Sequence, residues 1–136
     1  MDFSNGKKAG ELTDRGISFC RRFKRLGEIG DIERGISSFE DALRLTPEGH
    51  ADKSMGLSNL GSSLLRRFER LGGMGDIEKA ISSLEDALQL TPDGHTDKPN
   101  RLGNLAASLL ARFQYLGEMR DIEKAISSLQ DGVRLT

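Results

Sequence analysis

The chain has 136 residues, of which 36% are hydrophobic and 30% charged, and its net charge is -1. This length fits one domain, and the near-zero charge excludes a global attraction to nucleic acid or to an anionic membrane. No segment approaches the roughly 18 apolar residues of a membrane-spanning helix, and the first residues lack the apolar stretch of a secretory signal. The one cysteine, Cys20, excludes an internal disulfide and zinc sites built on several thiolates. We therefore expect a cytoplasmic protein without nucleic-acid or membrane partners.

The sequence repeats itself with a period of 45 residues. Similar segments begin at Asp31, Asp76 and Asp121, and the residues before each of them repeat at the same spacing. Residues 76–84 and 121–129 are identical, with the sequence DIEKAISSL. The repeat predicts a single domain over residues 1–136 with three units, at about 7–51, 52–96 and 97–136, and flexible residues 1–6.

Every unit begins with one predicted helix. In the second unit, Leu57, Leu60, Leu64 and Phe68 are spaced by three and four residues, which is typical of one apolar helical face. Gly72 then ends the helix, because glycine tolerates the left-handed conformation of a helix C-cap.

A second predicted helix follows in every unit. We expect Asp76 to cap its start, and the apolar residues up to Leu84 and beyond again form one face. The helix ends before Pro92, in a turn of sequence TPDGH. Asp97 is a candidate cap for the helix after that turn, and Pro99 is tolerated in the first turn of that helix.

Neighbouring units must stack, because one helix pair cannot bury its apolar face alone. The predicted fold is all-α, a solenoid of three helix-turn-helix repeats that forms a short right-handed superhelix. Small residues at equivalent places allow the helix axes to come close; they are Gly16, Gly61 and Ala106 in the first helices and Gly35, Ala80 and Ala125 in the second helices.

The pattern of small and apolar residues resembles the tetratricopeptide repeat. The residues that carry the resemblance are Leu60, Gly61, Leu64, Ala80, Leu84, Ala87 and Pro92. These units of 45 residues exceed the usual length of about 34, and they are similar to units of kinesin light chain and to fungal arrays associated with CHAT or NTPase domains. The resemblance implies a non-enzymatic protein-interaction scaffold without a cofactor, which binds a peptide or protein segment in the groove of its first helices.

Two positions depart from the family pattern. Arg15 stands where the other units have a leucine, and Gly132 stands where they have a second alanine. Both departures affect the packing of the terminal units.

The face of the first helices opposite the apolar stripe is the predicted binding surface. Its candidate residues are Ile17, Arg21, Ser58, Asn59, Ser62, Leu65, Arg66, Asn104, Ala107 and Leu110. The similarity to kinesin light chain implies that Asn59 and Asn104 hold a peptide backbone through their amides. Arg21 and Arg66 would then take an acidic side chain or a terminal carboxylate. The alternative is an empty surface lined by small and polar residues.

Histidines and paired acids do not form a predicted catalytic or metal site. His50 and His95 lie in equivalent turns without further ligands nearby in the sequence, which favours turn and capping roles. The pairs at 40–41 and 85–86 point about 100° apart on a helix and cannot act together, so we expect a solvated face.

Recurrent arginines admit two interpretations. Arg22, Arg67 and Arg112 could recognise an acidic ligand, or they could lie along the core and pair with recurrent carboxylates such as Asp41, Asp86 or Asp131. We favour the structural interpretation. The basic cluster of residues 21–25 surrounds a core-like phenylalanine in a chain of neutral overall charge, which argues against nucleic-acid binding.

The last unit has an apolar face with no expected cover. Ile126, Leu129 and Val133 form this face, and the terminal units of a solenoid need a polar outer surface. The alternatives are a fragment of a longer array, a regulatory fragment of a larger multidomain protein, and a structural module that assembles with itself, either end to end or by exchange of helices.

Overall fold

The computed structural model describes residues 3–135, and all the elements it defines are helices. In chain order they are α1 (Phe3–Leu26), α2 (Ile29–Leu45), α3 (Ala51–Leu71), α4 (Met74–Gln89), α5 (Lys98–Leu116) and α6 (Met119–Leu135). The predicted all-α class and the two helices per unit are confirmed. α1 already includes residues 3–6, which we expected to be flexible, whereas residues 1, 2 and 136 lie outside the described part.

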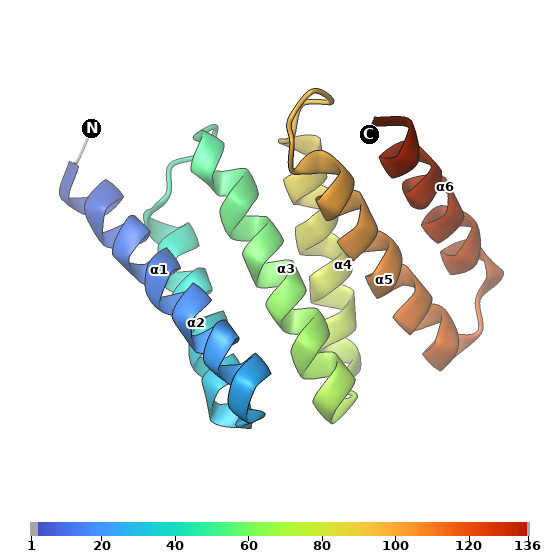
Figure 1. Ribbon diagram of the computed structural model, residues 1–136, viewed down its shortest axis with the longest axis horizontal. Coiled ribbons are helices and arrows are strands. Elements are labelled where there is room, and N and C mark those ends of the chain that lie inside the picture. Colours follow the sequence, from blue (N-terminus) through green and yellow to red (C-terminus); the bar gives the residue numbers. More distant parts are fainter. Residues whose placement is uncertain (1–2, 136) are drawn as a thin grey trace.

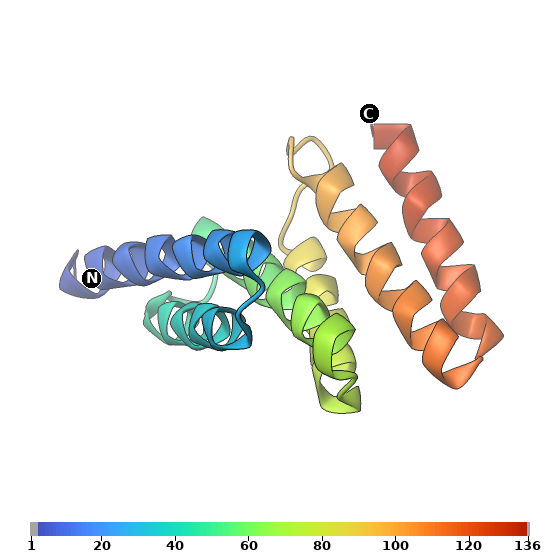
Figure 2. The ribbon, with the colours of Figure 1, turned by 60° about the horizontal axis from the view of Figure 1, so that its bottom comes forward.

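The helices pack as three consecutive pairs, α1 with α2, α3 with α4 and α5 with α6. Figure 1 shows α1, α3 and α5 in front, with α2 and α4 behind them. Each pair is turned relative to the one before it, as Figure 2 shows most clearly. This is the arrangement of a helical-repeat solenoid; the handedness of its superhelix stays a prediction.

Glycine follows each of the three first helices, as the sequence predicts, and Gly27 does so after α1 with φ of 71°. Gly72 follows α3 with φ of 74° and Gly117 follows α5 with φ of 73°. Their backbone N–H groups donate to the carbonyls of Phe68 and Phe113. A side chain at this left-handed conformation would be strained, so the recurrent glycine fixes where the first helix of a unit ends and the turn to the second helix begins.

The predicted cap of the second helix is wrong. α4 begins at Met74 with Gly73 as its N-cap, so Asp76 lies inside the first turn. Its carboxylate is held by Arg67 instead, through two hydrogen bonds of 2.8 Å. Pro99 does lie in the first turn of α5, and Asp97 is the N-cap residue there, although its side chain makes no capping bond.

Small residues bring the two helices of a unit together. A Cβ atom on Gly61 would lie 2.6 Å from Cγ of Leu84 and 3.2 Å from the carbonyl oxygen of Ala80. A Cβ atom on Gly16 would lie 2.5 Å from the ring of Phe39. Such distances leave no space for a side chain, so these glycines are packing positions, as predicted.

Candidate functional site

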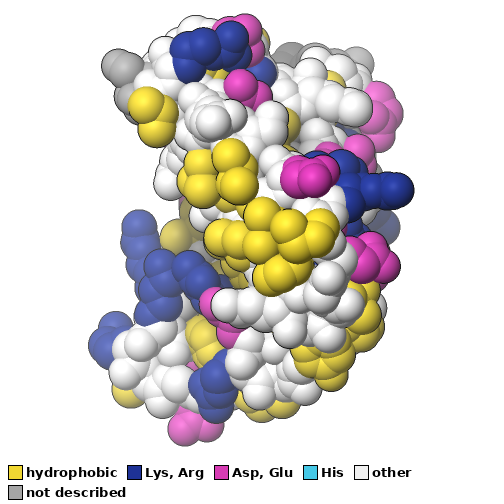
Figure 3. Space-filling view, turned by 90° about the vertical axis from the view of Figure 1, so that its right-hand side faces the viewer, with side chains coloured by type: hydrophobic (Ala, Val, Ile, Leu, Met, Phe, Trp, Pro, Cys, Tyr) yellow, Lys and Arg dark blue, Asp and Glu magenta, His cyan; other side chains and the backbone are white. Residues whose placement is uncertain are grey.

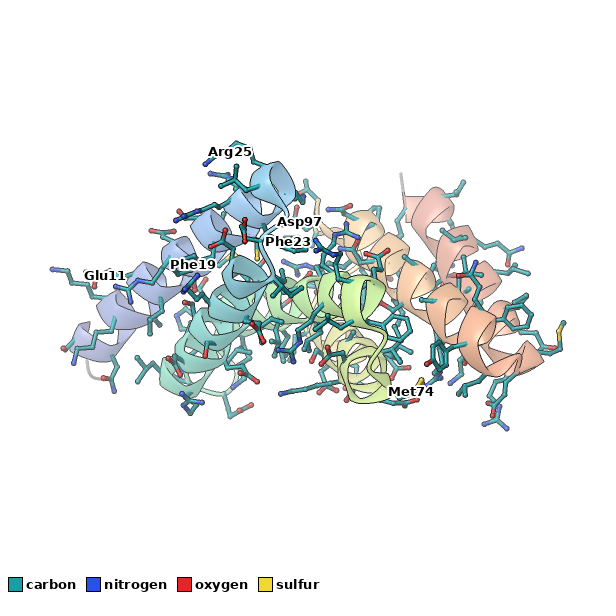
Figure 4. The ribbon with its side chains drawn as sticks, turned by 90° about the horizontal axis from the view of Figure 1, so that it is seen from below. Glu11, Phe19, Phe23, Arg25, Met74 and Asp97 are labelled. Atoms are coloured by element: carbon teal, nitrogen blue, oxygen red, sulfur yellow. The ribbon has the colours of Figure 1, made fainter. Side chains whose placement is uncertain are left out.

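A groove of about 400 Å³ opens between the first helices of the three units. Its lining comes mainly from α1, α3 and α5, and Ile32 and Phe39 of α2 contribute at its base. The residues contributed by the first helices are Ile17, Cys20, Arg21, Phe23, Lys24, Asn59, Ser62, Ser63, Arg66, Asn100 and Asn104. Figure 4 shows that Phe23 projects from α1 towards the interior of the molecule, whereas Arg25 projects away from it.

Six of the ten predicted site residues line this groove. They are Ile17, Arg21, Asn59, Ser62, Arg66 and Asn104. The other four lie elsewhere: Leu65 belongs to the hydrophobic core and Ser58 is buried, whereas Ala107 and Leu110 are exposed outside the groove.

Besides Ser63, two polar groove residues were not predicted, Lys24 and Asn100. Lys24 follows Arg21 by three residues and Asn100 precedes Asn104 by four, so each lies on the same helical face as a predicted residue. Extending the predicted face by one helical turn in each direction would have found both of them.

The charges that line the groove are all positive. Arg21, Lys24 and Arg66 contribute the cations, and no lining residue is acidic. Arg66 makes an exposed ion pair of 2.9 Å with Glu69, whereas no ion pair joins Arg21 or Lys24 to another residue within 3–135. The groove is therefore a local basic site on a chain that is almost neutral overall.

Amides and hydroxyls complete the polar lining. Asn104 Nδ2 donates to Ser62 Oγ at 3.2 Å, and so connects α5 to α3. The Nδ2 group of Asn59 is buried and finds no hydrogen-bond partner among the described residues. A buried donor without a partner is uncommon, and it marks a place where a ligand or a rearranged side chain gains a hydrogen bond.

Cys20 lines the same groove as a neutral thiol. Its sulfur lies 3.3 Å from Ser63 Oγ. Burial raises the pKa of the Cys20 thiol above its usual value, and the hydrogen bond from Ser63 and the charge of Lys24 only partly oppose this shift. Because the thiolate is the nucleophilic form, this environment disfavours a catalytic cysteine.

The two histidines have turn and capping roles, as expected. His50 is the N-cap residue of α3, and its Nδ1 accepts a hydrogen bond from the Asp52 backbone at 3.0 Å. His95 lies in the turn before α5, where its Nδ1 accepts a hydrogen bond from the backbone of the N-cap residue Asp97 at 3.1 Å. Within residues 3–135, no group of three or more histidine, cysteine or acidic side chains is placed to hold a metal ion.

The recurrent arginines form ion pairs within their own units, but with carboxylates other than the predicted ones. Arg67 and Arg112 each make two hydrogen bonds of 2.8 to 2.9 Å, to Asp76 and Asp121 respectively. Arg22 lies 3.4 Å from Asp31 in the first unit. The predicted carboxylates, at 41, 86 and 131, lie nearer the other end of the second helices.

The buried side chain of Arg101 was not predicted to have a structural role. Arg101 of α5 donates to the hydroxyls of Ser54 and Thr91, and Ser54 also donates to the Ala87 carbonyl oxygen. This network joins α3, α4 and α5 at the junction of the second and third units. The other units have glutamate and glycine at the equivalent positions, so the repeat pattern gave no signal for it.

The comparisons with known proteins agree with the repeat. The family model of the tetratricopeptide repeat matches residues 71–93, which contain α4 and the start of the turn that follows it. No curated protein matches the chain. Within residues 3–135, no helix combines the length and the apolar character that crossing a membrane requires.

Proposed function

We propose that this chain, a tetratricopeptide-repeat protein, binds an extended acidic segment of another protein in the groove between α1, α3 and α5. Repeats of this family generally mediate protein binding, and their helical fold is typically non-catalytic. The observation that carries the proposal is the groove lining, which combines three cations and several amides with no carboxylate.

The size and shape of the groove favour an extended segment. A volume of about 400 Å³ lies within the range of roughly 300 to 1,000 Å³ typical of ligand pockets. Since three successive first helices contribute to its walls, a ligand that runs across them contacts all three units. An extended chain of about 3.3 Å per residue suits such a course better than a compact ligand does.

The charge of the groove selects acidic side chains. Arg21 and Lys24 of α1 face Arg66 of α3 across the groove without an acidic lining residue between them. A carboxylate in this place forms charge-assisted hydrogen bonds, which are about twice as strong as neutral ones. The Arg66–Glu69 pair is exposed, so its exchange for a ligand carboxylate costs less than about 1 kcal/mol.

The asparagines suit a peptide backbone. An amide group donates and accepts at the same time, as a peptide unit does. Asn59 carries a buried donor that finds no partner within residues 3–135, which costs about 1–3 kcal/mol. Rotation of the Asn59 amide towards a ligand carbonyl offsets this cost, and Asn104 provides a second amide one unit further along.

Fluorescence anisotropy with labelled ten-residue peptides tests the proposal. We expect peptides rich in Asp and Glu to bind, and matched peptides with Asn and Gln to bind at least about tenfold more weakly, since each charge-assisted bond contributes about 1.5–3 kcal/mol. Added salt should weaken the acidic peptides selectively. The combined substitution of Asn59, Arg66 and Asn104 by alanine should abolish binding and leave the helical circular dichroism unchanged.

Arg44→Gln is the matched control, because Arg44 is exposed on α2 outside the groove. It should leave peptide affinity unchanged, whereas Arg21→Gln should reduce it. Equal binding of the acidic and amide peptides, or an equal loss in the Arg44 and Arg21 variants, would show that the groove does not select acidic segments.

A further inference from the structure

A cavity of about 150 Å³ lies at the junction of the first two units. α1 contributes Ala9 and Asp14 to its lining, α2 contributes Thr46, and α3 contributes Asp52 and Gly56. Ala9 and Gly56 are buried, whereas Asp14 and Asp52 are exposed, so the cavity reaches from the surface into the packed interior. None of its lining residues belongs to the groove between the first helices.

An arginine fills the equivalent place at the next junction. The counterparts of Ala9, Thr46, Asp52 and Gly56, one repeat period further along, are Ser54, Thr91, Asp97 and Arg101. Arg101 is buried, and its guanidinium donates to the hydroxyls of Ser54 and Thr91. It also lies 3.7 Å from the Asp97 carboxylate. Because the first junction has glycine instead of arginine, the space that the guanidinium fills at the second junction stays open at the first.

The hydroxyl of Thr46 has an unused capacity to accept a hydrogen bond. Thr46 Oγ1 donates to the Ala42 carbonyl at 2.8 Å, as Thr91 Oγ1 does to the Ala87 carbonyl at 2.6 Å. The Thr91 oxygen also accepts a hydrogen bond of 2.8 Å from Arg101. No group within residues 3–135 donates to the Thr46 oxygen. Since a hydroxyl accepts as well as donates, Thr46 can receive a guanidinium as Thr91 does.

Both charges that line the cavity are negative. Asp14 and Asp52 supply them, and no described lining residue is basic. Asp14 makes no ion pair within residues 3–135. Asp52 lies 3.7 Å from Nδ1 of His50, which already accepts the backbone N–H of Asp52. A cation that enters the cavity therefore meets two carboxylates and a hydroxyl acceptor, without competition from a basic lining residue.

The exposed apolar face of α6 offers nothing comparable to a cation. Figure 3 shows a hydrophobic patch on this side of the molecule, and Ile126, Leu129 and Val133 are exposed on α6. The shallow depression between these side chains is lined by Arg134 and by no acidic residue. The acidic cavity at the first junction is therefore the place where a cationic group gains both charge pairing and hydrogen bonds.

We propose that this cavity binds the guanidinium group of an arginine residue from a partner protein. A volume of about 150 Å³ accommodates a group as large as benzene, which suits a guanidinium with the end of its alkyl stem. Whole small-molecule ligands usually need roughly 300 to 1,000 Å³. The planar guanidinium presents several donors at once, and Thr46 and Asp52 provide the acceptors that Thr91 and Asp97 provide for Arg101.

A partner protein is the source of the arginine to which we commit. Tetratricopeptide repeats generally mediate protein binding, and the cavity holds one side-chain head group while its rim stays open to a polypeptide backbone. The site is separate from the basic groove and selects the opposite charge. Failure of one site in a binding experiment therefore leaves the other unaffected.

Titration of the whole chain with a capped arginine residue, N-acetylarginine N-methylamide, tests the proposal by NMR. We expect saturable shifts of the Gly56 amide and Thr46 methyl signals at millimolar concentration. The matched control is the capped citrulline residue, which has the same shape without the charge. It should bind at least about tenfold more weakly, because charge-assisted hydrogen bonds are lost. Free arginine carries a carboxylate and should also bind more weakly beside Asp14 and Asp52.

Thr46→Val and Asp52→Asn each remove one acceptor and should weaken the capped arginine at least about fivefold. Asp86→Asn, at an exposed aspartate of α4 outside the cavity, is the matched variant and should leave its affinity unchanged. Gly56→Arg should abolish binding by filling the cavity from within. Its Cβ atom would lie 2.8 Å from Cδ2 of Leu43, so Leu43 must move; the other two variants need no such movement and test the proposal by themselves.

Three results would overturn the proposal. One is a titration in which the capped arginine shifts no signal around the cavity or binds no better than the capped citrulline. Another is equal affinity of the Thr46→Val, Asp52→Asn and Asp86→Asn variants for the capped arginine. The third is tighter binding of free arginine than of the capped residue, which would assign the cavity to the free amino acid instead of a partner protein.

Discussion

Replacing Gly61 by alanine gives a direct test of the close approach between α3 and α4. The new methyl group would lie 2.6 Å from Cγ of Leu84, a fully buried side chain, and 3.2 Å from a backbone oxygen of Ala80. Overpacking of this kind costs about 1–3 kcal/mol. The change from glycine to alanine inside a helix returns about 1 kcal/mol of helix propensity, so we expect a net loss of up to about 2 kcal/mol.

Gly103 provides the matched control, because it lies inside α5 with no atom within 4 Å of an added Cβ. Gly103→Ala should gain about 0.5–1 kcal/mol. Urea denaturation followed by circular dichroism measures both free energies of unfolding, and the two variants should differ by about 2 kcal/mol. In a Leu84→Ala background the contacts with the Leu84 side chain disappear and only the 3.2 Å approach to the Ala80 oxygen remains, so Gly61→Ala should cost clearly less than in the unchanged background. Equal gains for Gly61→Ala and Gly103→Ala in the unchanged background would refute the packing argument.

Three further predictions concern the polar contacts. Asp121 is buried and held by Arg112, so Asp121→Asn should lower the free energy of unfolding, measured by urea titration, by about 2–4 kcal/mol. Asp131 is half exposed, so Asp131→Asn should change the same free energy by less than about 0.5 kcal/mol. Equal effects of the two substitutions would contradict the pairing of Asp121 with Arg112. His95→Ala removes the acceptor of the Asp97 backbone N–H in the turn before α5 and should cost about 0.5–1.5 kcal/mol; coinciding thermal melts of the two proteins would contradict this role. Burial raises the pKa of the Cys20 thiol, so the thiol's contribution to stability is complete below its pKa in the unfolded chain and is lost as pH rises through its pKa in the folded chain. Cys20→Ala should remove this loss of stability at alkaline pH. At neutral pH, iodoacetamide should react with Cys20 more slowly in the folded than in the unfolded protein.

Most of the helical organisation follows from local sequence. Leucines at three- and four-residue spacing, the glycine at 72 and the proline at 92 act within a few residues of their own positions, and they predict the helices and turns that the structure contains. The N-cap of α4 is the exception. Asp76 has the right residue type for a cap, but an arginine nine residues earlier takes its carboxylate.

The pairing of the arginines depends on the helical hairpin. Arg112 lies near the end of α5, and the short turn places that end beside the start of α6, where Asp121 lies. Asp131 lies at the far end of α6 and pairs with Arg134. The residue types predicted that each arginine has an acidic partner, but only the direction of the second helix decides which one.

The candidate site shows the same division. Helical spacing placed Asn59, Ser62 and Arg66 on one face of α3, and the structure brings them together in the groove. Leu65, predicted for the same face, lies in the core instead. The angle at which neighbouring units meet decides how wide the exposed part of each helical face is, and this angle depends on side chains from other units.

By itself, the sequence determined the three units, their helix pairs and the turns between them, because these depend on a 45-residue repeat and on contacts close in the chain. Only the tertiary structure decided which copy of a repeated side chain is buried. Leu84 and Leu129 lie in identical sequences, but α5 covers the α4 face and no described residue covers the equivalent face of α6. Burial depends on the neighbouring unit, which the local sequence does not contain.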